Sequence, residues 1–393
     1  MMAASPSPYA APRGACPSLE TPMAVADGLL VRLRPARGFL SPRELALLGR
    51  AAVELGNGRV EVSTRGSLQL RGFTEESAEA LRQRLDRAGI AVATGLVVEH
   101  APLAGRDPEE RGDPRPLIAR LDAVARKATG LAPKVSLTVS AGGRYDLATF
   151  GADIAVALVE PGRWQIAAAG VALGIADEAA VPEIVRGLLA KIAALGAGAR
   201  AKDLDADVLR FGPGGPALPP APAPAPGPIT LTDGGEALAL ALPFGQCSGT
   251  MLEALADSLG AAAIYPAPHR HLVIVGDAPD AEGLGFWTRG EDVALTLCSG
   301  AVRTGHGLVH TADVARMLVD GTPEIAGRLH LHSATCAKGC GFAGRKGVRL
   351  VAMEGRLALL PFPGASEAPL AWVRESAIEE DLAAFARLWL ELQ

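Results

Sequence analysis

The sequence predicts an α+β protein built from two pseudo-symmetric halves, and two observations lead to that expectation. The first is the stretch at residues 216–228, Pro-Ala-Leu-Pro-Pro-Ala-Pro-Ala-Pro-Ala-Pro-Gly-Pro, which divides the 393-residue chain into parts of similar size. Proline at this density cannot continue a helix or pair inside a sheet, so an extended linker is expected. The second observation is a β-α-β pattern that occurs once on each side of this linker.

In the first pattern, residues 28–34 are expected to form a strand. Ser41 is followed by Pro42 and Glu44, the order typical of an N-cap, a first helical residue and an acid in the first turn. Residues 59–71 then alternate apolar and polar side chains, which predicts a single strand.

The second pattern follows the linker. Residues 237–243 are an apolar strand, a helix over 251–259 is capped by Ser248 or Thr250, and a strand is expected at 271–275. Arg65 and Arg270 occupy nearly the same offset from the start of the helix in the two units.

A longer α/β segment follows each pattern. Strands are expected at residues 134–139, 153–158, 293–297 and 328–332, a hairpin at 348–359, and helices at 181–195, 309–318 and 377–392. The predicted domains are residues 23–90, 91–215, 229–285 and 286–393, with the linker at 216–228.

Composition excludes several classes of protein. The formal net charge of −5 argues against a general nucleic-acid binder, and basic residues at particular strand ends suit a discrete anionic ligand better. No uncharged apolar run is long enough to cross a membrane, and the N-terminus has no signal-peptide core. Five cysteines, an odd number, do not indicate a disulfide framework, so a cytoplasmic protein is expected.

Three cysteines near the C-terminus suggest iron–sulfur chemistry. Cys336 and Cys340 form a C-x3-C pair beside glycines, and Cys298 follows an apolar run. Glycine lets the backbone approach a bulky inorganic centre that thiolates hold. The alternative is that the three are buried, inert thiols.

Two histidine pairs lie near these cysteines. His330 and His332 alternate on the strand before Cys336, and His306 and His310 are four residues apart. Either pair could supply nitrogen ligands to a mononuclear non-haem iron, or both could be ordinary polar residues near a loop.

Several stretches resemble the sulfite/nitrite reductase superfamily and, within it, the precorrin-3B synthase family. They are Arg13-Gly-Ala-Cys-Pro17, Asp27-Gly-Leu-Leu-Val-Arg32, Ser63-Thr-Arg-Gly-Ser-Leu-Gln-Leu-Arg-Gly72, Pro133-Lys134 and Cys336-Ala-Lys-Gly-Cys340. The resemblance implies that each half is a ferredoxin-like β-α-β half-domain followed by a nitrite/sulfite-reductase-type α/β domain.

The superfamily holds a 4Fe–4S cluster with a C-x5-C and a C-x3-C pair, which implies Cys298, Cys336 and Cys340 as ligands. Thr304 stands where the remaining cysteine is expected. The fourth ligand could be Thr304, or Cys16 or Cys247 brought in by folding. The same residues are also compatible with a three-cysteine centre or with a protein that holds no cluster.

The resemblance also implies a tetrapyrrole ligand with many carboxylates. By the repeat and by resemblance, Arg65, Arg71, Lys134 and Arg270 would bind them, since Arg and Lys at strand ends suit carboxylates. The alternative is that they are solvated strand residues.

Two positions depart from the sulfite reductase pattern. The K-x-K motif is Lys134-Val-Ser136, and Leu96 stands where another active-site arginine is expected. Losing two cations weakens the Coulomb attraction for a small dianion, so sulfite reduction is not expected.

The implied function is that of an oxygen-dependent monooxygenase that converts precorrin-3A to precorrin-3B, with NADH as electron source. No G-x-G-x-x-G follows a strand, so a separate electron-donating reductase is expected. The rivals are a sirohaem-dependent sulfite or nitrite reductase and a tetrapyrrole-binding protein without a cluster.

Overall fold

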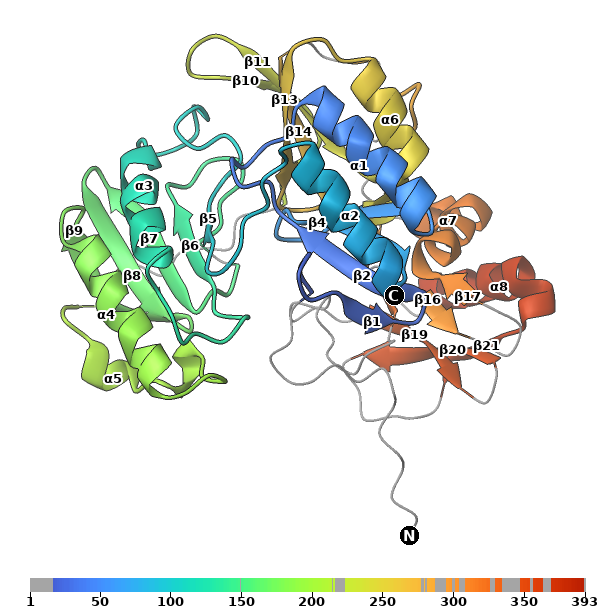
Figure 1. The fold of residues 1–393 in the computed structure, drawn as a ribbon. Coiled ribbons are helices and arrows are strands. Elements are labelled where there is room, and N and C mark those ends of the chain that lie inside the picture. Colours follow the sequence, from blue (N-terminus) through green and yellow to red (C-terminus); the bar gives the residue numbers. More distant parts are fainter. Residues whose placement is uncertain are drawn as a thin grey trace.

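The structure of the chain is a computed structural model. It describes residues 17–148, 150–213, 215, 223–276, 279, 281–286, 295–298, 301–303, 308–325, 329–333, 347–353, 356–362 and 369–391. Four larger sheets and their helices make up this part of the chain (Figure 1).

The first half-domain has two helices over one face of a sheet. Its elements are β1 (Met23–Val25), β2 (Gly28–Leu33), α1 (Pro42–Leu55), β3 (Arg59–Val62), β4 (Leu68–Phe73) and α2 (Glu75–Arg87). Helix α1 begins as predicted, because the Ser41 side chain accepts from the Glu44 N–H while the Glu44 carboxylate accepts from the Ser41 N–H.

The single strand expected at residues 59–71 is wrong. It is a hairpin, β3 and β4, joined by a turn over residues 63–67 in which Gly66 has a φ of +72°. The Ser63 hydroxyl accepts from the Ser67 N–H at 3.0 Å and stabilises the turn. The apolar residues on either side of the turn, Val60 and Val62 before it and Leu68 and Leu70 after it, keep the same two-residue spacing, which is why periodicity alone did not find the turn.

The first α/β domain, green in Figure 1, packs its helices against a five-stranded sheet of order β5-β6-β7-β8-β9. Its elements are β5 (Val98–Glu99), α3 (Arg115–Ala125), β6 (Leu137–Ser140), β7 (Ile154–Glu160), β8 (Arg163–Ala168), β9 (Val171–Asp177), α4 (Val181–Ala194), η1 (Ala201–Asp203) and α5 (Ala206–Leu209).

The second half-domain repeats the first. Its elements are β10 (Gly227–Thr230), β11 (Glu236–Ala241), η2 (Pro243–Gly245), β12 (Gln246–Ser248), α6 (Gly249–Asp257), β13 (Ala262–Ala267) and β14 (His271–Gly276). Strand β10 begins inside the stretch predicted as linker. Pro228 is tolerated because β10 is an edge strand that pairs only with β11.

The second α/β domain is described in part. Its elements are β15 (Leu295–Cys298), β16 (Ala301–Arg303), β17 (Leu308–His310), α7 (Thr311–Gly321), η4 (Pro323–Ile325), β18 (Leu329–Ser333), β19 (Gly347–Met353), β20 (Arg356–Phe362), β21 (Ala371–Val373), η5 (Glu375–Ala377) and α8 (Ile378–Glu391). Its main sheet has the order β15-β18-β19-β20-β21.

Backbone hydrogen bonds join the two half-domains. Strand β12 of the second half completes the sheet of the first by pairing with β3, and Leu40 and Ile264 exchange two hydrogen bonds of 2.8 Å. Helices α1 and α6 lie side by side above the sheets (Figure 1). One hydrophobic core therefore contains residues of both halves, among them Leu70 and Ile274.

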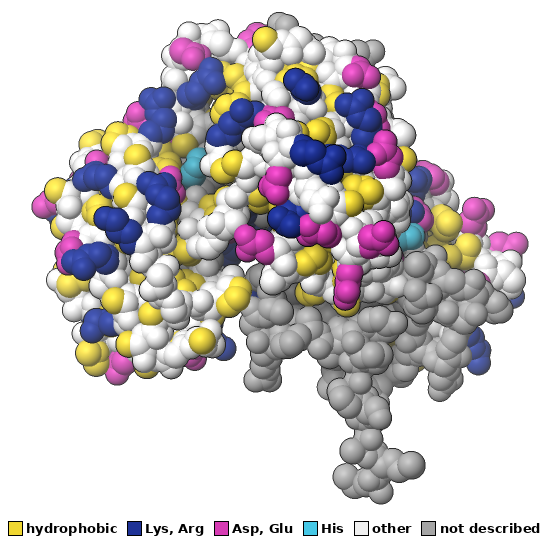
Figure 2. Space-filling view, viewed as in Figure 1, with side chains coloured by type: hydrophobic (Ala, Val, Ile, Leu, Met, Phe, Trp, Pro, Cys, Tyr) yellow, Lys and Arg dark blue, Asp and Glu magenta, His cyan; other side chains and the backbone are white. Residues whose placement is uncertain are grey.

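Basic side chains are spread over the surface that Figure 2 shows, on the first α/β domain at the left and on the central part. The surface is indented where these two parts meet (Figure 2). Among the helices of the described residues, none combines the length and the apolar character needed to cross a bilayer.

Candidate functional site

A cavity of about 680 Å³ lies between the first half-domain and the first α/β domain. Its charged lining residues are Arg32, Arg34, Arg65, Lys134, Arg200, Glu20 and Glu99. Cations outnumber carboxylates in this lining, so the cavity attracts anionic ligands. A volume of this size is in the usual range for binding sites of small molecules and cofactors.

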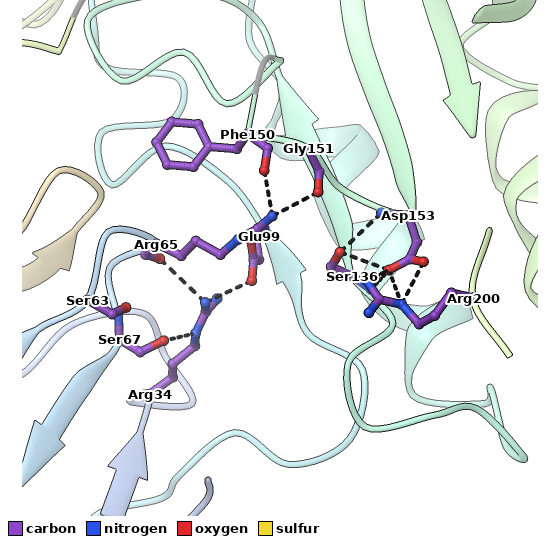
Figure 3. Close-up of polar contacts among 10 residues, drawn as sticks. All are labelled: Arg34, Ser63, Arg65, Ser67, Glu99, Ser136, Phe150, Gly151, Asp153 and Arg200. Atoms are coloured by element: carbon purple, nitrogen blue, oxygen red, sulfur yellow. Dashed lines mark hydrogen bonds and ion pairs between the residues drawn. The ribbon is translucent and has the colours of Figure 1, made fainter. Parts of the chain in front are cut away.

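Two arginines of the half-domain share one carboxylate of the α/β domain (Figure 3). Glu99 accepts from Arg34 Nη2 at 2.8 Å through one oxygen and from Arg65 Nη1 at 2.5 Å through the other. Arg65 Nη2 also donates to the carbonyl oxygens of Phe150 at 2.6 Å and Gly151 at 3.1 Å. One negative charge thus balances two positive ones, and the group keeps a net positive charge.

The turn between β3 and β4 places this pair of arginines. Arg65 is inside the turn, and Arg34, which follows β2, donates from Nε to the Ser67 hydroxyl at 2.6 Å. Arg34 Nη2 also reaches the Arg65 carbonyl at 3.4 Å. The hairpin that sequence periodicity did not reveal therefore builds this side of the cavity.

A second cluster lies in the α/β domain (Figure 3). Asp153 is buried, and its carboxylate accepts from Arg200 Nη2 at 2.6 Å. It also accepts from the Ser136 N–H at 3.0 Å and the Ala201 N–H at 2.9 Å. Burial raises the pKa of Asp153, but the hydrogen bonds and the charge of Arg200 outweigh it, so the pKa lies below its usual value.

The cavity brings together four of the six positions that the repeat and the resemblance singled out. Arg65, Leu96, Lys134 and Ser136 all line it. Two of these positions carry cations and two carry neutral side chains. The turn before β4 and the loops before β5 and β6 bring them together from distant parts of the sequence.

Arg71 lies elsewhere. It is 4% exposed, pairs with Asp27 through two hydrogen bonds of 2.7 and 2.8 Å, and has Glu61 at 3.4 Å. It is not among the described residues that line the cavity. Burial raises the pKa of Asp27, but the hydrogen bond and charge of Arg71 outweigh it, and the pKa is lowered. A substrate-binding role for Arg71 stays a prediction.

Arg270 also lies outside the lining, although its turn meets that of Arg65. The turn between β13 and β14 docks on the turn between β3 and β4, with a bridge between Arg65 and Pro268. The His269 N–H donates to the Thr64 carbonyl at 3.0 Å. Equivalent turns of the two half-domains thus touch, and a role of Arg270 in substrate binding stays a prediction.

A row of polar side chains crosses the central sheet from the cavity. Arg32, Gln69, Glu61 and Gln246 are direct cross-strand neighbours on β2, β4, β3 and β12. Gln69 accepts from Arg32 at 2.9 Å, and Glu61 accepts from Gln69 at 3.3 Å and from Gln246 at 2.6 Å. Each partner satisfies the next, as buried polar groups require.

Arg59 carries this row into the second α/β domain. It donates to Gln246 at 3.2 Å and makes a two-pronged pair with Asp313 of α7 at 2.7 and 3.3 Å. The polar row therefore connects the cavity with the part of the chain in which the predicted cluster cysteines occur. Neither Arg59 nor Asp313 was found by sequence reasoning.

A curated protein from Sinorhizobium sp named "Precorrin-3B synthase" is 34% identical to this chain over 408 residues, which cover 96% of this chain and 88% of that protein. The chain belongs to the precorrin-3B synthase family. Residues 22–88 match the model of the nitrite/sulfite reductase ferredoxin-like half domain. This range coincides with the first half-domain, so the two-half α+β fold predicted from the sequence is confirmed.

A solved structure shares this fold. The Mycobacterium tuberculosis NirA protein is similar to the chain with a TM-score of 0.62 at 19% identity, over 93% of this chain and 84% of that one. At this identity the likeness concerns the fold alone. It places the precorrin-3B synthase family and NirA on one architecture.

The family resemblance implies a 4Fe–4S cluster, and the structure describes the backbone at one of the predicted ligands, Cys298. Cys298 ends β15, and its Cα partner on the parallel strand β18 is His332, one residue before that strand ends at Ser333. Cys336 follows the end of β18 by three residues in the sequence. Cys16, Thr304, His306, Cys336 and Cys340 lie outside the described residues.

Cys247 belongs to the hydrophobic core. It lies on β12, is 7% exposed, and burial raises the pKa of its thiol well above its usual value. The thiolate, which is the form that binds iron, is therefore disfavoured there. Its position suits a packing role.

His310 is the candidate iron ligand whose side chain the structure describes. Burial and the charge of Arg59 lower its pKa, while Asp27 and Asp313 act in the opposite direction. Its Nδ1 is buried without a hydrogen-bond partner among the described residues. No group of three or more His, Cys, Asp or Glu in the described part of the chain could hold a metal ion, so a mononuclear iron site stays a prediction.

Proposed function

We propose that this chain is an oxygen-dependent monooxygenase of cobalamin biosynthesis that converts precorrin-3A to precorrin-3B in the cytoplasm. The name of the Sinorhizobium relative supports precorrin-3B as the product. The electrons come from NADH through a separate reductase, since the sequence has no dinucleotide-binding fingerprint.

The observation that carries the proposal is the composition of the cavity. Arg65 and Lys134 provide cations, whereas Leu96 and Ser136 are neutral where the resemblance to sulfite reductases leads one to expect cations. Fewer cations suit a large ligand with spaced carboxylates better than a small dianion that needs several charges at one point. The tetrapyrrole is then the substrate and occupies the cavity itself.

The side chains of the cavity bind and orient this substrate. Arg65 and Arg34 donate charge-assisted hydrogen bonds to a carboxylate of the macrocycle, and Lys134 supplies a further positive charge. Glu99 holds both guanidinium groups in place before the ligand arrives, which lowers the cost of ordering them. A 4Fe–4S cluster held by Cys298, Cys336 and Cys340 would supply electrons for the reduction of dioxygen.

Turnover under ¹⁸O₂ tests this function. Anaerobically purified protein is mixed with precorrin-3A, NADH and a reductase, then exposed to ¹⁸O₂, and the product is analysed by mass spectrometry. One ¹⁸O atom is expected in the product, with the other leaving as water. Recovery of unchanged precorrin-3A, together with a sirohaem absorption band and sulfide formation from sulfite, would instead identify a sirohaem-dependent reductase.

A further inference from the structure

Arg200 is fixed at the wall of the cavity by a buried anchor. It precedes η1, lines the cavity, and directs Nε and Nη2 toward Asp153 at 2.6 to 2.9 Å (Figure 3). Its side chain remains 30% exposed, whereas that of Asp153 is 3% exposed. The carboxylate therefore belongs to the domain interior and the guanidinium to the cavity.

The Asp153 carboxylate is held by several hydrogen bonds besides those from Arg200. Besides Arg200, the Asp153 carboxylate accepts from Ser136 N–H and Oγ, at 3.0 and 3.1 Å, and from the Ala201 N–H at 2.9 Å. Its own N–H donates to Ser136 Oγ at 3.1 Å. These hydrogen bonds occupy both oxygens of the Asp153 carboxylate. The Nη1 group of Arg200, in contrast, has no hydrogen-bond partner among the described residues, so a ligand can bind it without displacing Asp153.

Ser136 connects this arrangement with the K-x-K pattern. Ser136 stands where the K-x-K pattern expects its second lysine, and its hydroxyl binds the same Asp153 that holds Arg200. The guanidinium group at this wall therefore comes from residue 200, and with Asp153 it forms a pair that carries no net charge. Unlike a lysine, an arginine stays charged under all ordinary conditions and presents a flat pair of donors to a carboxylate.

We propose that Arg200, held by Asp153, is a carboxylate-binding residue of the cavity on the side of the first α/β domain, separate from Arg34 and Arg65 on the side of the half-domain. The inference rests on the proposed function, since the ligand would be a peripheral carboxylate of precorrin-3A. Two binding points on facing domains fix the orientation of a large macrocycle, because each holds a different side chain of the ligand.

The test is the dissociation constant of precorrin-3A, measured anaerobically and without reductant from the change in ligand absorption. Arg200→Gln is expected to raise this dissociation constant about tenfold, because one charge-assisted hydrogen bond is lost. The dissociation constant of the variant should also depend less on salt concentration. The double variant Asp153→Asn/Arg200→Gln, which leaves no unpaired buried charge, is expected to bind as weakly while keeping its folded state. Arg163→Gln is the matched control, because Arg163 pairs with the exposed Asp177 on the same domain, outside the cavity lining.

The outcomes separate this inference from the proposed function. If wild-type protein does not bind precorrin-3A, the proposed function fails and the inference fails with it. If wild-type protein binds it and Arg65→Gln weakens binding, but both Arg200 variants keep wild-type affinity and salt dependence, the inference alone is overturned. Weaker binding in both Arg200 variants, with Arg163→Gln unchanged, supports it.

Discussion

The buried carboxyl group of Glu110 has a raised pKa. Burial raises its pKa to about 7, and the charges of Asp107 and Asp113 add to the effect, while the N–H of Gly105, which donates to it at 2.6 Å, offsets part of it. Glu110 packs beneath the turn at Gly143, where an added Cβ would lie 2.9 Å from its Cγ. The ionisation of this residue is therefore tied to folding.

Glu110 predicts a pH dependence of stability. Because its pKa is raised from 4.5 to about 7, the folded protein binds more protons than the unfolded chain between these values. Its contribution is fully present below pH 4.5 and is lost as the pH rises through 7. We expect the free energy of urea unfolding to fall between pH 5 and pH 7.5 more steeply in wild-type protein than in Glu110→Gln. Equal slopes would contradict the assignment.

The cluster cysteines predict a spectroscopic result. Cys336→Ser and Cys340→Ser should abolish the iron–sulfur absorption of anaerobically purified protein, because serine is a poor iron ligand. Cys247→Ser, a change in the hydrophobic core, should retain it. Cys16→Ser shows whether Cys16 is the fourth ligand, since cluster loss as severe as in Cys336→Ser is expected only then. Full iron and sulfide content in the variants at 336 and 340 would rule out the cluster assignment.

Sequence reasoning found some cavity residues and missed others for a physical reason. Arg65 and Lys134 lie in motifs that can be recognised locally. Arg34 and Arg200 acquire their positions from Glu99 and Asp153, which are 65 and 47 residues away along the chain. Contacts at such separations depend on how the domains pack, and no local sequence pattern predicts them.

At the scale of single elements, caps were predictable and turns were less so. Ser41 and Ser248 cap α1 and α6 by accepting from backbone N–H groups three residues on, a short-range interaction that the residue types reveal. The turn at 63–67 interrupts a strand pattern, but the apolar residues before and after it keep the same two-residue spacing. Gly66 alone, at a φ of +72°, marks the place where the chain reverses.

Helices α1 and α6 approach each other closely at two glycines. A Cβ on Gly49 would lie 2.5 Å from the Gly249 carbonyl oxygen, so Gly49→Ala should lower the free energy of unfolding by about 1–3 kcal/mol. Gly187→Ala on α4 is the control: its Cβ would meet nothing within 4 Å, and it should stabilise by about 0.5–1 kcal/mol. Chemical denaturation measures both. Equal effects of the two changes would show that the helix contact is not tight.

At the scale of the whole molecule, direct contacts join the two halves in addition to the linker. The first α/β domain contacts the second half-domain through Tyr145, whose hydroxyl lies 2.9 Å from His271 Nδ1. Both side chains are nearly inaccessible to solvent, and burial lowers the pKa of His271 to about 4. The sequence indicated two similar halves and a linker. The pairing of β12 with β3 and the contact between Tyr145 and His271 depend on tertiary packing.

In the proposed function, precorrin-3A occupies the cavity between the first half-domain and the first α/β domain. An anaerobic crystal structure of the complex tests it most directly. We expect the macrocycle in this cavity, with carboxylates within hydrogen-bond distance of Arg65 and of Lys134. A macrocycle bound at another surface, with these two side chains still free of ligand, would contradict it.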